Sequence, residues 1–395
     1  MKAVNKWASV VKLFCGAVFI ISAVSKLVTI DSFEMYVYSF GLFPLVLCFY
    51  LSRLLIAAEL LLGVALISHR NHRFSTISSL LFLLFFVVFL VYAQLIGRTD
   101  SCHCFGDLLP FNPVQSIMKN AVMILMMLFV YKYAAHDWYP RWWLVSIIYI
   151  CVAALFVLFS IKMLHALDLY SLVLLAVSLG MGVLASFPFF SRWWMTVPLI
   201  LAPFVTTFIL SPPDSWFYHE GDVRCDKELF THEIQRNVAV EDDSEPMLDT
   251  ALQDTSAIRN SDTTLVAENV IYDTVAALSK AGLDKGRHLV AFFSPSCGYC
   301  RLAAEKISTM ATRGGIDKNK VVYVFPGALE QERYDSFYQR ANSCKYSEVR
   351  IDRELFVRIT RAAFPLIFLV EDGEVVATYA YRAIDEQKIS EFLSK

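Results

Sequence analysis

Seven stretches of this sequence are long and apolar enough to cross a lipid bilayer as helices. A spanning helix needs about 20 mostly apolar residues, because the hydrocarbon core is about 30 Å thick and a helix rises about 1.5 Å per residue. The last stretch is short and contains Pro198 and Pro203, which neighbouring helices must accommodate. The sequence therefore predicts a multipass membrane bundle of about seven helices, at residues 7–28, 45–68, 74–96, 117–134, 142–161, 169–190 and 193–210.

Charge divides the 395-residue chain near Leu210. Residues 1–210 contain 13 Lys and Arg against 7 Asp and Glu, whereas residues 211–395 contain 22 against 30. One half is therefore predicted to lie in the membrane and the other to be a soluble, mildly acidic region. This division excludes a purely soluble enzyme and a disordered protein. It also excludes a nucleic-acid partner, since no basic stripe lies outside the apolar half.

Positive charges near the ends of the apolar stretches orient the bundle, because flanking Lys and Arg stay on the cytoplasmic side. Eight fall on one predicted side of the membrane: Lys2, Lys6, Lys12, Arg70, Arg73, Lys132, Arg141 and Arg192. Four fall on the other side: Lys26, Arg98, Lys119 and Lys162. With seven crossings, this pattern places the N-terminus inside and both the loop 97–116 and everything after Leu210 outside. The first stretch is predicted to be a permanent anchor, since no small-x-small cleavage site follows it.

The C-terminal half is predicted to contain a polar connector at residues 211–262 and an α/β domain at residues 263–395. The connector carries an acidic run at residues 241–245 and no pattern that indicates a fold. In the domain, apolar runs predict helices at 265–278, 300–311, 331–341, 353–360 and from 385, and strands at 288–294, 321–325, 366–370 and 374–379. Helices that alternate with strands and end in a hairpin predict a mixed sheet with helices on its faces.

Two cysteines, Cys297 and Cys300, stand where a predicted strand passes into a predicted helix. The unpaired N–H groups and the dipole at a helix N-terminus favour a thiolate, which is the species that attacks a disulfide. The second cysteine, one helical turn later, can resolve the mixed disulfide. The alternatives are a structural disulfide and half of a zinc site, for which the soluble half offers only Cys225 and Cys344 as further thiols.

Three segments of the C-terminal domain resemble thioredoxin-fold proteins: HLVAFF, SPSCGYC, and Phe364-Pro365 immediately before LIFLV. The resemblance implies that Pro365 is cis, lies beside the active-site disulfide and helps to bind a substrate chain, together with Phe364 and Tyr299. Thioredoxins carry a buried Asp six residues before the first active-site cysteine, and this chain has Ala291 there. A different group, or water, must therefore assist the proton transfers.

A second pair of thiols, Cys102 and Cys104, lies in the loop that is predicted to face outward. Two thiols one residue apart on the oxidising side of a membrane are suited to a strained disulfide that is readily reduced and exchanged. Binding of Cu(I) by these thiols and His103 is the metal alternative, because soft thiolates favour that ion.

Residues 7–134 resemble the methylamine-utilisation MauE type of membrane protein, within the wider DoxX-like group. The resemblance rests on GAVFIISAVSKL, on Glu59 followed by LLLG, and on CHCFG followed later by SIMKN. The family usually has Arg before that Asn, whereas this chain has Lys119. The resemblance implies a four-helix module at residues 1–135 that handles reducing equivalents for disulfide formation, with Cys102 and Cys104 as its redox pair. Residues 136–210 would add three further helices.

Two charges, Arg53 and Glu59, fall within the second apolar stretch. Charge within a membrane is costly, so these residues form either a proton or quinone-headgroup site or ion pairs between helices. Cys15 and Cys151 lie at similar predicted depth and are either a disulfide-shuttling pair or apolar filling. Cys48, Cys225 and Cys344 have no assigned role.

Taken together, two thiol pairs on one side of a membrane predict a multipass thiol-disulfide oxidoreductase in the inner membrane of a bacterium, with its C-terminal domain in the periplasm. Its expected partners are exported proteins with thiols or disulfides, membrane lipid and a quinone. The sequence requires no metal and no bound cofactor other than that quinone. Two rivals are a copper-handling membrane protein and an assembly or transport factor that uses the thioredoxin fold only for binding.

Overall fold

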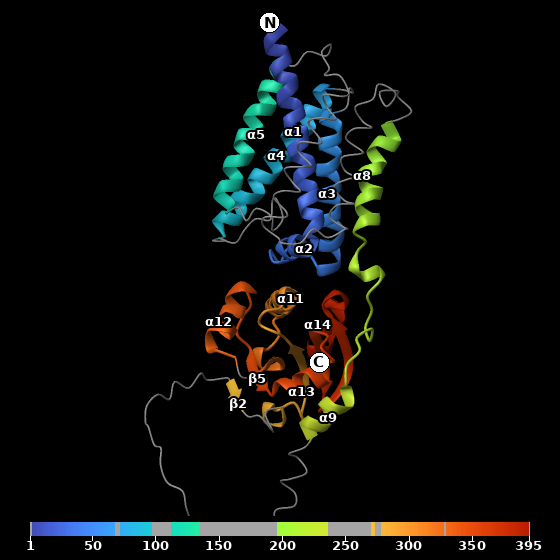
Figure 1. The fold of residues 1–395 in the computed structure, drawn as a ribbon, viewed down its shortest axis with the longest axis vertical. Coiled ribbons are helices and arrows are strands. Elements are labelled where there is room, and N and C mark those ends of the chain that lie inside the picture. Colours follow the sequence, from blue (N-terminus) through green and yellow to red (C-terminus); the bar gives the residue numbers. More distant parts are fainter. Residues whose placement is uncertain are drawn as a thin grey trace, which may run out of the picture. The chain divides into compact units, whose positions relative to one another are not determined.

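The computed structural model divides the chain into two compact units, Met1–Pro213 and Asp214–Lys395 (Figure 1). It describes residues 2–67, 72–96, 112–133, 196–235, 270–272, 278–327 and 329–394.

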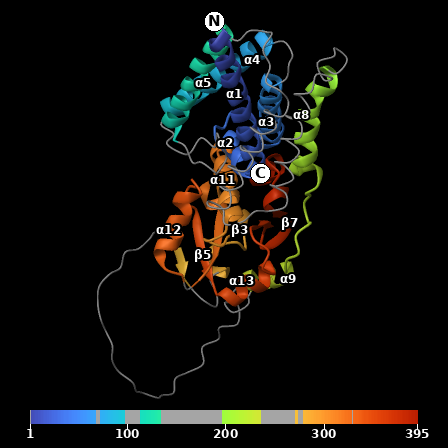
Figure 2. The same cartoon turned by 45° about the horizontal axis from the view of Figure 1, so that its top comes forward.

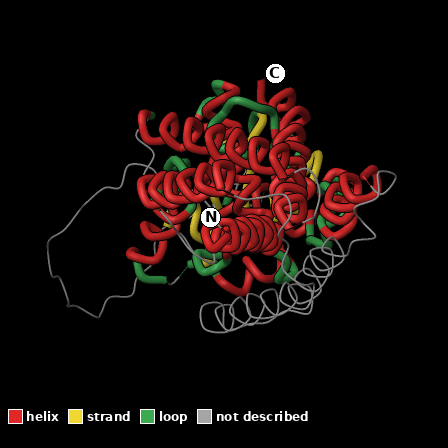
Figure 3. Tube along the Cα trace, turned by 90° about the horizontal axis from the view of Figure 1, so that it is seen from above, coloured by secondary structure: helices red, strands yellow, loops and turns green. Residues whose placement is uncertain are grey.

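Every described element of the first unit is a helix, and the chain begins with α1 at the end marked N in Figure 3. The helices are α1 (Lys2–Val28), α2 (Ile30–Tyr38), α3 (Leu45–Ile67), α4 (His72–Leu95), α5 (Pro113–Tyr133) and α8 (Thr196–Leu210). Among the described residues, α1, α3, α4 and α5 are long and apolar enough to span a membrane, which confirms the first four predicted spans. The fifth and sixth predicted spans lie outside the described residues. The seventh corresponds to α8, which is shorter and contains Pro203.

Helices α1 and α3 approach each other closely at a pair of glycines. A Cβ atom on Gly16 would lie 2.9 Å from the Ile67 side chain, and one on Gly63 would lie 2.6 Å from the Ile20 side chain. The backbones also nearly touch here, since the Gly63 oxygen is 3.1 Å from the Cβ position of Gly16. In a bilayer, where lipid is as apolar as the helices, small residues permit the close packing that holds helices together.

The second unit is built on a sheet of six strands in the order β2-β5-β4-β3-β6-β7. Strands β2, β5, β4 and β3 are parallel, whereas β6 is antiparallel to both β3 and β7. The strands are β2 (Val270–Tyr272), β3 (Arg287–Phe292), β4 (Val321–Pro326), β5 (Ser347–Ile351), β6 (Leu366–Glu371) and β7 (Glu374–Ala380). The helices are α9 (Lys227–Gln235), α11 (Gly298–Gly314), α12 (Gln331–Arg340), α13 (Arg353–Thr360) and α14 (Glu386–Ser394). The predicted mixed sheet and thioredoxin-like fold are confirmed.

Helices cover both faces of the sheet (Figure 2). On one face, α9 and α13 pack on Phe292 and Phe368, with the Phe230 ring 5.6 Å and 4.9 Å from these two rings. On the other face, α11 and α12 pack on an aromatic layer in which Phe293 lies 4.9 Å from Tyr323. The alternation of side chains along each strand supplies one set of apolar residues to each face.

Three parts of the second unit differ from the sequence-based prediction. Val270–Tyr272 form an edge strand paired with β5, not part of a helix, as suits β-branched and aromatic residues beside an open sheet edge. Helix α9 lies inside the predicted connector, and its fully buried Phe230 and Ile234 belong to the core of the domain. Strand β5 was not predicted.

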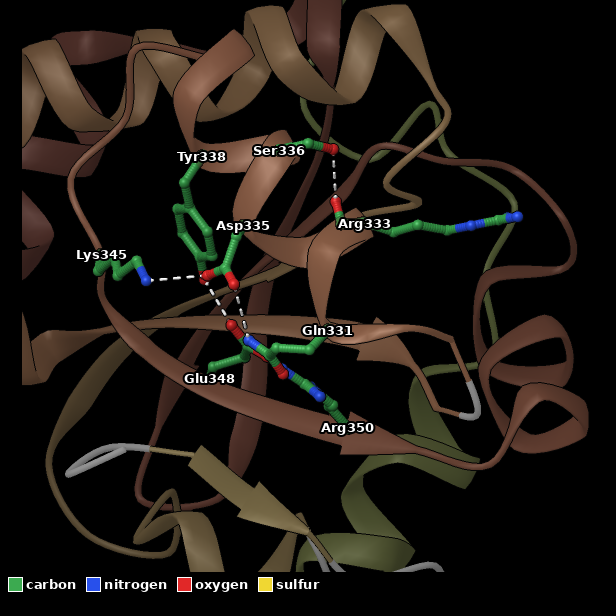
Figure 4. A network of polar contacts seen from close by, with 8 residues as sticks. All are labelled: Gln331, Arg333, Asp335, Ser336, Tyr338, Lys345, Glu348 and Arg350. Atoms are coloured by element: carbon green, nitrogen blue, oxygen red, sulfur yellow. Dashed lines mark hydrogen bonds and ion pairs between the residues drawn. The ribbon is translucent and has the colours of Figure 1, made fainter. Parts of the chain in front are cut away.

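Strand β5 is difficult to recognise in the sequence because it contains charged residues. Val349 faces the apolar core, whereas Glu348 and Arg350 are buried under α12 on the other face. Figure 4 shows how these charges are satisfied: the Nε of Arg350 donates to Glu348 at 2.5 Å, and the Tyr338 hydroxyl donates to Glu348 at 3.0 Å. Arg350 also donates to Gln331 at 2.9 Å. A strand with buried charges is stable here because each charge has a partner.

Candidate functional site

The predicted redox pair lies at the first turn of α11. Strand β3 ends at Phe292, and Cys297 is the N-cap residue of the helix. The backbone N–H of Cys300 donates to the Cys297 sulfur at 3.2 Å, so one of the orphan N–H groups of the first turn stabilises negative charge on that atom. Cys297 is half-buried and therefore accessible, whereas Cys300 is fully buried.

The surroundings of Cys297 favour its thiolate. The hydrogen bond from the Cys300 thiol, followed by backbone N–H groups of Cys300 and Tyr299 and the charge of Arg301, lowers the pKa of Cys297 to about 6, although partial burial opposes the shift. At neutral pH most of the thiol at this position is therefore ionised. This low pKa fits the role of attacking thiol that the sequence predicts for Cys297.

The surroundings of Cys300 favour its neutral thiol. Burial, followed by the neighbouring Cys297, raises the pKa of Cys300 far above its ordinary value. The backbone N–H of Ser294, 3.5 Å from the Cys300 sulfur, opposes this only weakly. At neutral pH one thiol of the pair is therefore mostly ionised, and the other keeps its proton.

The predicted substrate-binding residues lie near the same ends of the central strands as the thiols. Phe292, the last residue of β3, pairs with Leu366, so Pro365 lies at the end of β3 that leads to Cys297. The Phe364–Pro365 peptide bond is cis, as the thioredoxin resemblance implies. Pro365 is buried, whereas Phe364 is 37% exposed and offers an apolar surface.

Aromatic residues continue from the CGYC turn into the domain. Tyr299 is 50% exposed and lies 5.6 Å from the ring of Tyr381. The buried ammonium of Lys306 lies 3.9 Å from the centroid of that second ring. Ala291, at the position of the thioredoxin Asp, is fully buried. Lys306 and Tyr381 are not evident as neighbours of this turn in the sequence, because only the fold brings them behind it.

In the membrane unit, Arg53 and Glu59 both form ion pairs between helices, but not with each other. The ammonium of Lys26 on α1 lies 2.6 Å from Glu59 on α3. Arg53 pairs with Glu34 on α2 and donates to the backbone oxygens of Ser211 at 2.6 Å and Pro212 at 2.8 Å. A buried charge that has such partners is retained at tolerable cost.

A small cavity adjoins the Lys26–Glu59 pair. It has a volume of about 20 Å³, and Ser22, Asn120 and Phe86 also line it. A space of this size accommodates about one water molecule. Glu59 and Lys26 join two helices, which is the ion-pair alternative offered by the sequence analysis.

The remaining cysteines are dispersed. Cys15 is fully buried among apolar residues of α1, α3, α4 and α5, and the thiol of Cys48 contacts the Phe43 oxygen at 3.7 Å. Burial raises the pKa of Cys225. Cys344 is half-buried, and its backbone N–H donates to Ser308. Three predicted residues, namely Cys102, Cys104 and Cys151, lie outside the described part of the chain.

Comparison with known proteins supports both units. Residues 4–133 match the family described as methylamine utilisation protein MauE, which confirms the resemblance of the first unit. Protein TlpB of Flavobacterium psychrophilum is 23% identical over 323 residues, which cover 76% of this chain and 71% of that protein. Neither unit alone is as long as that alignment, so the similarity extends over both units.

Two solved structures are similar to the C-terminal part. One is the crystal structure of the thioredoxin domain of a thiol-disulfide oxidoreductase from Bacteroides vulgatus, 18% identical, covering 28% of this chain and 81% of that one, with a TM-score of 0.24. The other is the solution structure of a thiol:disulfide interchange protein from a Bacteroides species, 17% identical, covering 29% and 78%, also with a TM-score of 0.24.

We predict that Cys297 is alkylated by iodoacetamide with a half-maximal rate near pH 6, because its pKa is lowered to about 6 and only the thiolate reacts. The rate falls as the pH drops below this value. Cys300→Ala removes the hydrogen bond that lowers the pKa most, so the midpoint moves upward. Mass spectrometry of the Cys297 peptide measures the rate. Cys344→Ala is the control and leaves the midpoint in place, and a wild-type midpoint above pH 8 contradicts the prediction.

Proposed function

We propose that this chain is a membrane-bound thiol-disulfide oxidoreductase that acts on exported proteins. The observation that carries the proposal is the difference between two thiols in one helical turn. Cys297 is accessible, caps α11 and has a pKa of about 6. Cys300 is buried and its pKa is raised. This is the division of labour that disulfide exchange requires, since one thiol must attack and the other must resolve.

Reduction of a client disulfide takes two exchanges. The Cys297 thiolate attacks one client sulfur, a mixed disulfide forms, and the second client sulfur leaves as a thiolate that takes a proton from water. Cys300 then gives up its proton and attacks the Cys297 sulfur, which releases the first client sulfur as a thiol. The client has gained two electrons, and Cys297 and Cys300 have become a disulfide. The reverse sequence oxidises a client dithiol.

A second thiol pair returns Cys297 and Cys300 to their starting redox state after each turnover. We assign this exchange to Cys102 and Cys104, the other closely spaced cysteine pair in the sequence. The relative reduction potentials of the two pairs set the direction of electron flow. Beyond this pair we propose a quinone, a two-electron carrier that dissolves in the bilayer. Oxidising or reducing the quinone pool in intact cells then shifts the redox state of Cys102 and Cys104, as thiol trapping measures.

The C-terminal unit is proposed to lie in the periplasm of a bacterium. The support is the distribution of positive charge, together with membrane-spanning helices. Lys12 and Lys26 are buried within the membrane unit and do not flank a span. Without them, the eight charges against four become seven against three, so the asymmetry persists. An oxidising compartment also suits two exchanging thiol pairs.

The second unit should be active by itself. A fragment of residues 214–395 keeps Phe230 and Ile234, which complete its core, and is expected to reduce insulin in the presence of dithiothreitol. Cys297→Ser lowers the rate by roughly a hundredfold or more, because the nucleophile is lost. Cys225→Ser is the matched control. If Cys297→Ser retains the activity of the fragment, the domain is a binding module and the enzyme proposal fails.

The orientation is testable with a membrane-impermeant maleimide. In intact spheroplasts the reagent is expected to label Cys297 of the reduced protein, because the C-terminal unit faces outward. Mass spectrometry of the Cys297 peptide gives the extent of labelling, and the Cys297→Ser protein shows the background. Protection of Cys297 until the spheroplasts are lysed places the domain in the cytoplasm and overturns the proposed location.

The relay between the two pairs is testable by trapping. Cys300→Ser removes the resolving thiol, so a mixed disulfide at Cys297 persists. We expect part of this trapped species to link Cys297 to Cys102 or Cys104, and the link to disappear when both are changed to Ser. Non-reducing electrophoresis and mass spectrometry detect it. If trapping occurs only with client proteins and is unchanged by the loop substitutions, the two redox sites work separately.

A further inference from the structure

Three arginines surround a groove beside the active-site segment. Arg333 and Arg340 lie seven residues apart on α12, hence on one face of that helix, and Arg353 is the first residue of α13. The groove has a volume of about 560 Å³, and its other wall includes residues 294–296. These residues directly precede Cys297. We call this site the arginine groove.

The three guanidinium groups are exposed, and within the described residues none of them makes an ion pair. Figure 4 shows the Arg333 side chain extending away from the polar network that its own helix forms with Arg350. Some other arginines of the same unit are neutralised, as Arg287 is by Glu371 at 2.7 Å and Arg313 is by Glu386 at 3.1 Å.

This concentration of positive charge is unexpected in an acidic domain. Residues 211–395 contain 30 Asp and Glu against 22 Lys and Arg, so acidic partners for three exposed arginines are abundant along the chain. Like charges around one groove repel each other, and an anion placed between them relieves that repulsion. Arginine also binds carboxylates through two parallel hydrogen bonds. The groove is therefore suited to carboxylates.

We propose that the arginine groove binds acidic residues that flank the reactive cysteine of a client protein, and so selects among clients. This inference rests on the proposed function, because a client held at Cys297 has its neighbouring residues next to residues 294–296. An anionic lipid headgroup is a weaker candidate occupant, since the domain as a whole is acidic and is repelled by an anionic membrane surface.

The test uses the reduced full-length protein in nanodiscs and two peptides with the same intramolecular disulfide. In one peptide Asp and Glu flank the cysteines, and in the other Asn and Gln take their place. Stopped reactions give the second-order rate constant for the single reduction of each peptide by the reduced protein. We expect the acidic peptide to react about tenfold faster at low salt, because exposed ion pairs contribute modestly and three of them act together. Added salt reduces this ratio.

The triple variant Arg333→Gln, Arg340→Gln, Arg353→Gln is expected to bring the ratio close to one. The matched control, Arg224→Gln, Lys227→Gln, Lys318→Gln, removes three exposed cations that do not line the groove and keeps the tenfold ratio. Equal loss in both variants means that the overall field of the domain, and not the groove, selects the peptide. A wild-type ratio of one also overturns the inference.

Two further experiments show whether something other than a client protein occupies the arginine groove. If the groove variants change the rate only in phosphatidylglycerol nanodiscs, and equally for both peptides, a lipid headgroup occupies the groove and the inference is wrong. If neutralising the acidic run at residues 241–245 abolishes the effect of the groove variants, the chain's own segment is the occupant, and the inference is again wrong. If the wild-type protein reduces neither peptide, the proposed function itself fails.

Discussion

Burying a charge costs several kcal/mol per ion unless an opposite charge and hydrogen bonds replace the lost water. This cost determines how buried charges are paired in both units. In the membrane unit it joins Lys26 to Glu59 and Arg53 to Glu34, so three helices are held by two ion pairs. In the soluble unit the same cost joins Glu348 to Arg350 beneath α12. The arginine groove is the contrast: its charges are exposed, avoid this cost and are available to a ligand.

Burial also separates the pKa values of the two thiols in the CGYC turn. Cys297 and Cys300 have the same side chain and occupy one helical turn, yet the pKa of one is lowered and that of the other is raised. The helix N-terminus stabilises the thiolate at the cap position, while the core excludes water from the second sulfur. The proposed thiol-disulfide oxidoreductase thus obtains one ionised and one protonated thiol from fold geometry alone, without the buried carboxylate of thioredoxins, whose position Ala291 occupies.

The features that sequence predicted well have local causes. Long apolar runs predicted α1, α3, α4 and α5, and the CGYC turn was recognised from four residues. The errors have tertiary causes. Strand β5 was missed because buried Glu348 and Arg350 are polar in sequence and become acceptable only as partners. The arginine groove was missed because α12 and α13 are separated by β5 in the chain and meet only in the folded domain. Glu59 was identified, but its partner Lys26 was taken as a flanking charge.

The position of α9 in the chain has a consequence for how the domain is made. Phe230 packs on Phe292 and Phe368, so a helix near the start of the domain completes its core only with strands near the end. Contacts between residues so far apart in sequence form late and slow the folding of a domain. During synthesis, α9 leaves the ribosome long before β6 exists. Its apolar side therefore stays unpacked, exposed to water or bound to a chaperone, until the last strands are translated.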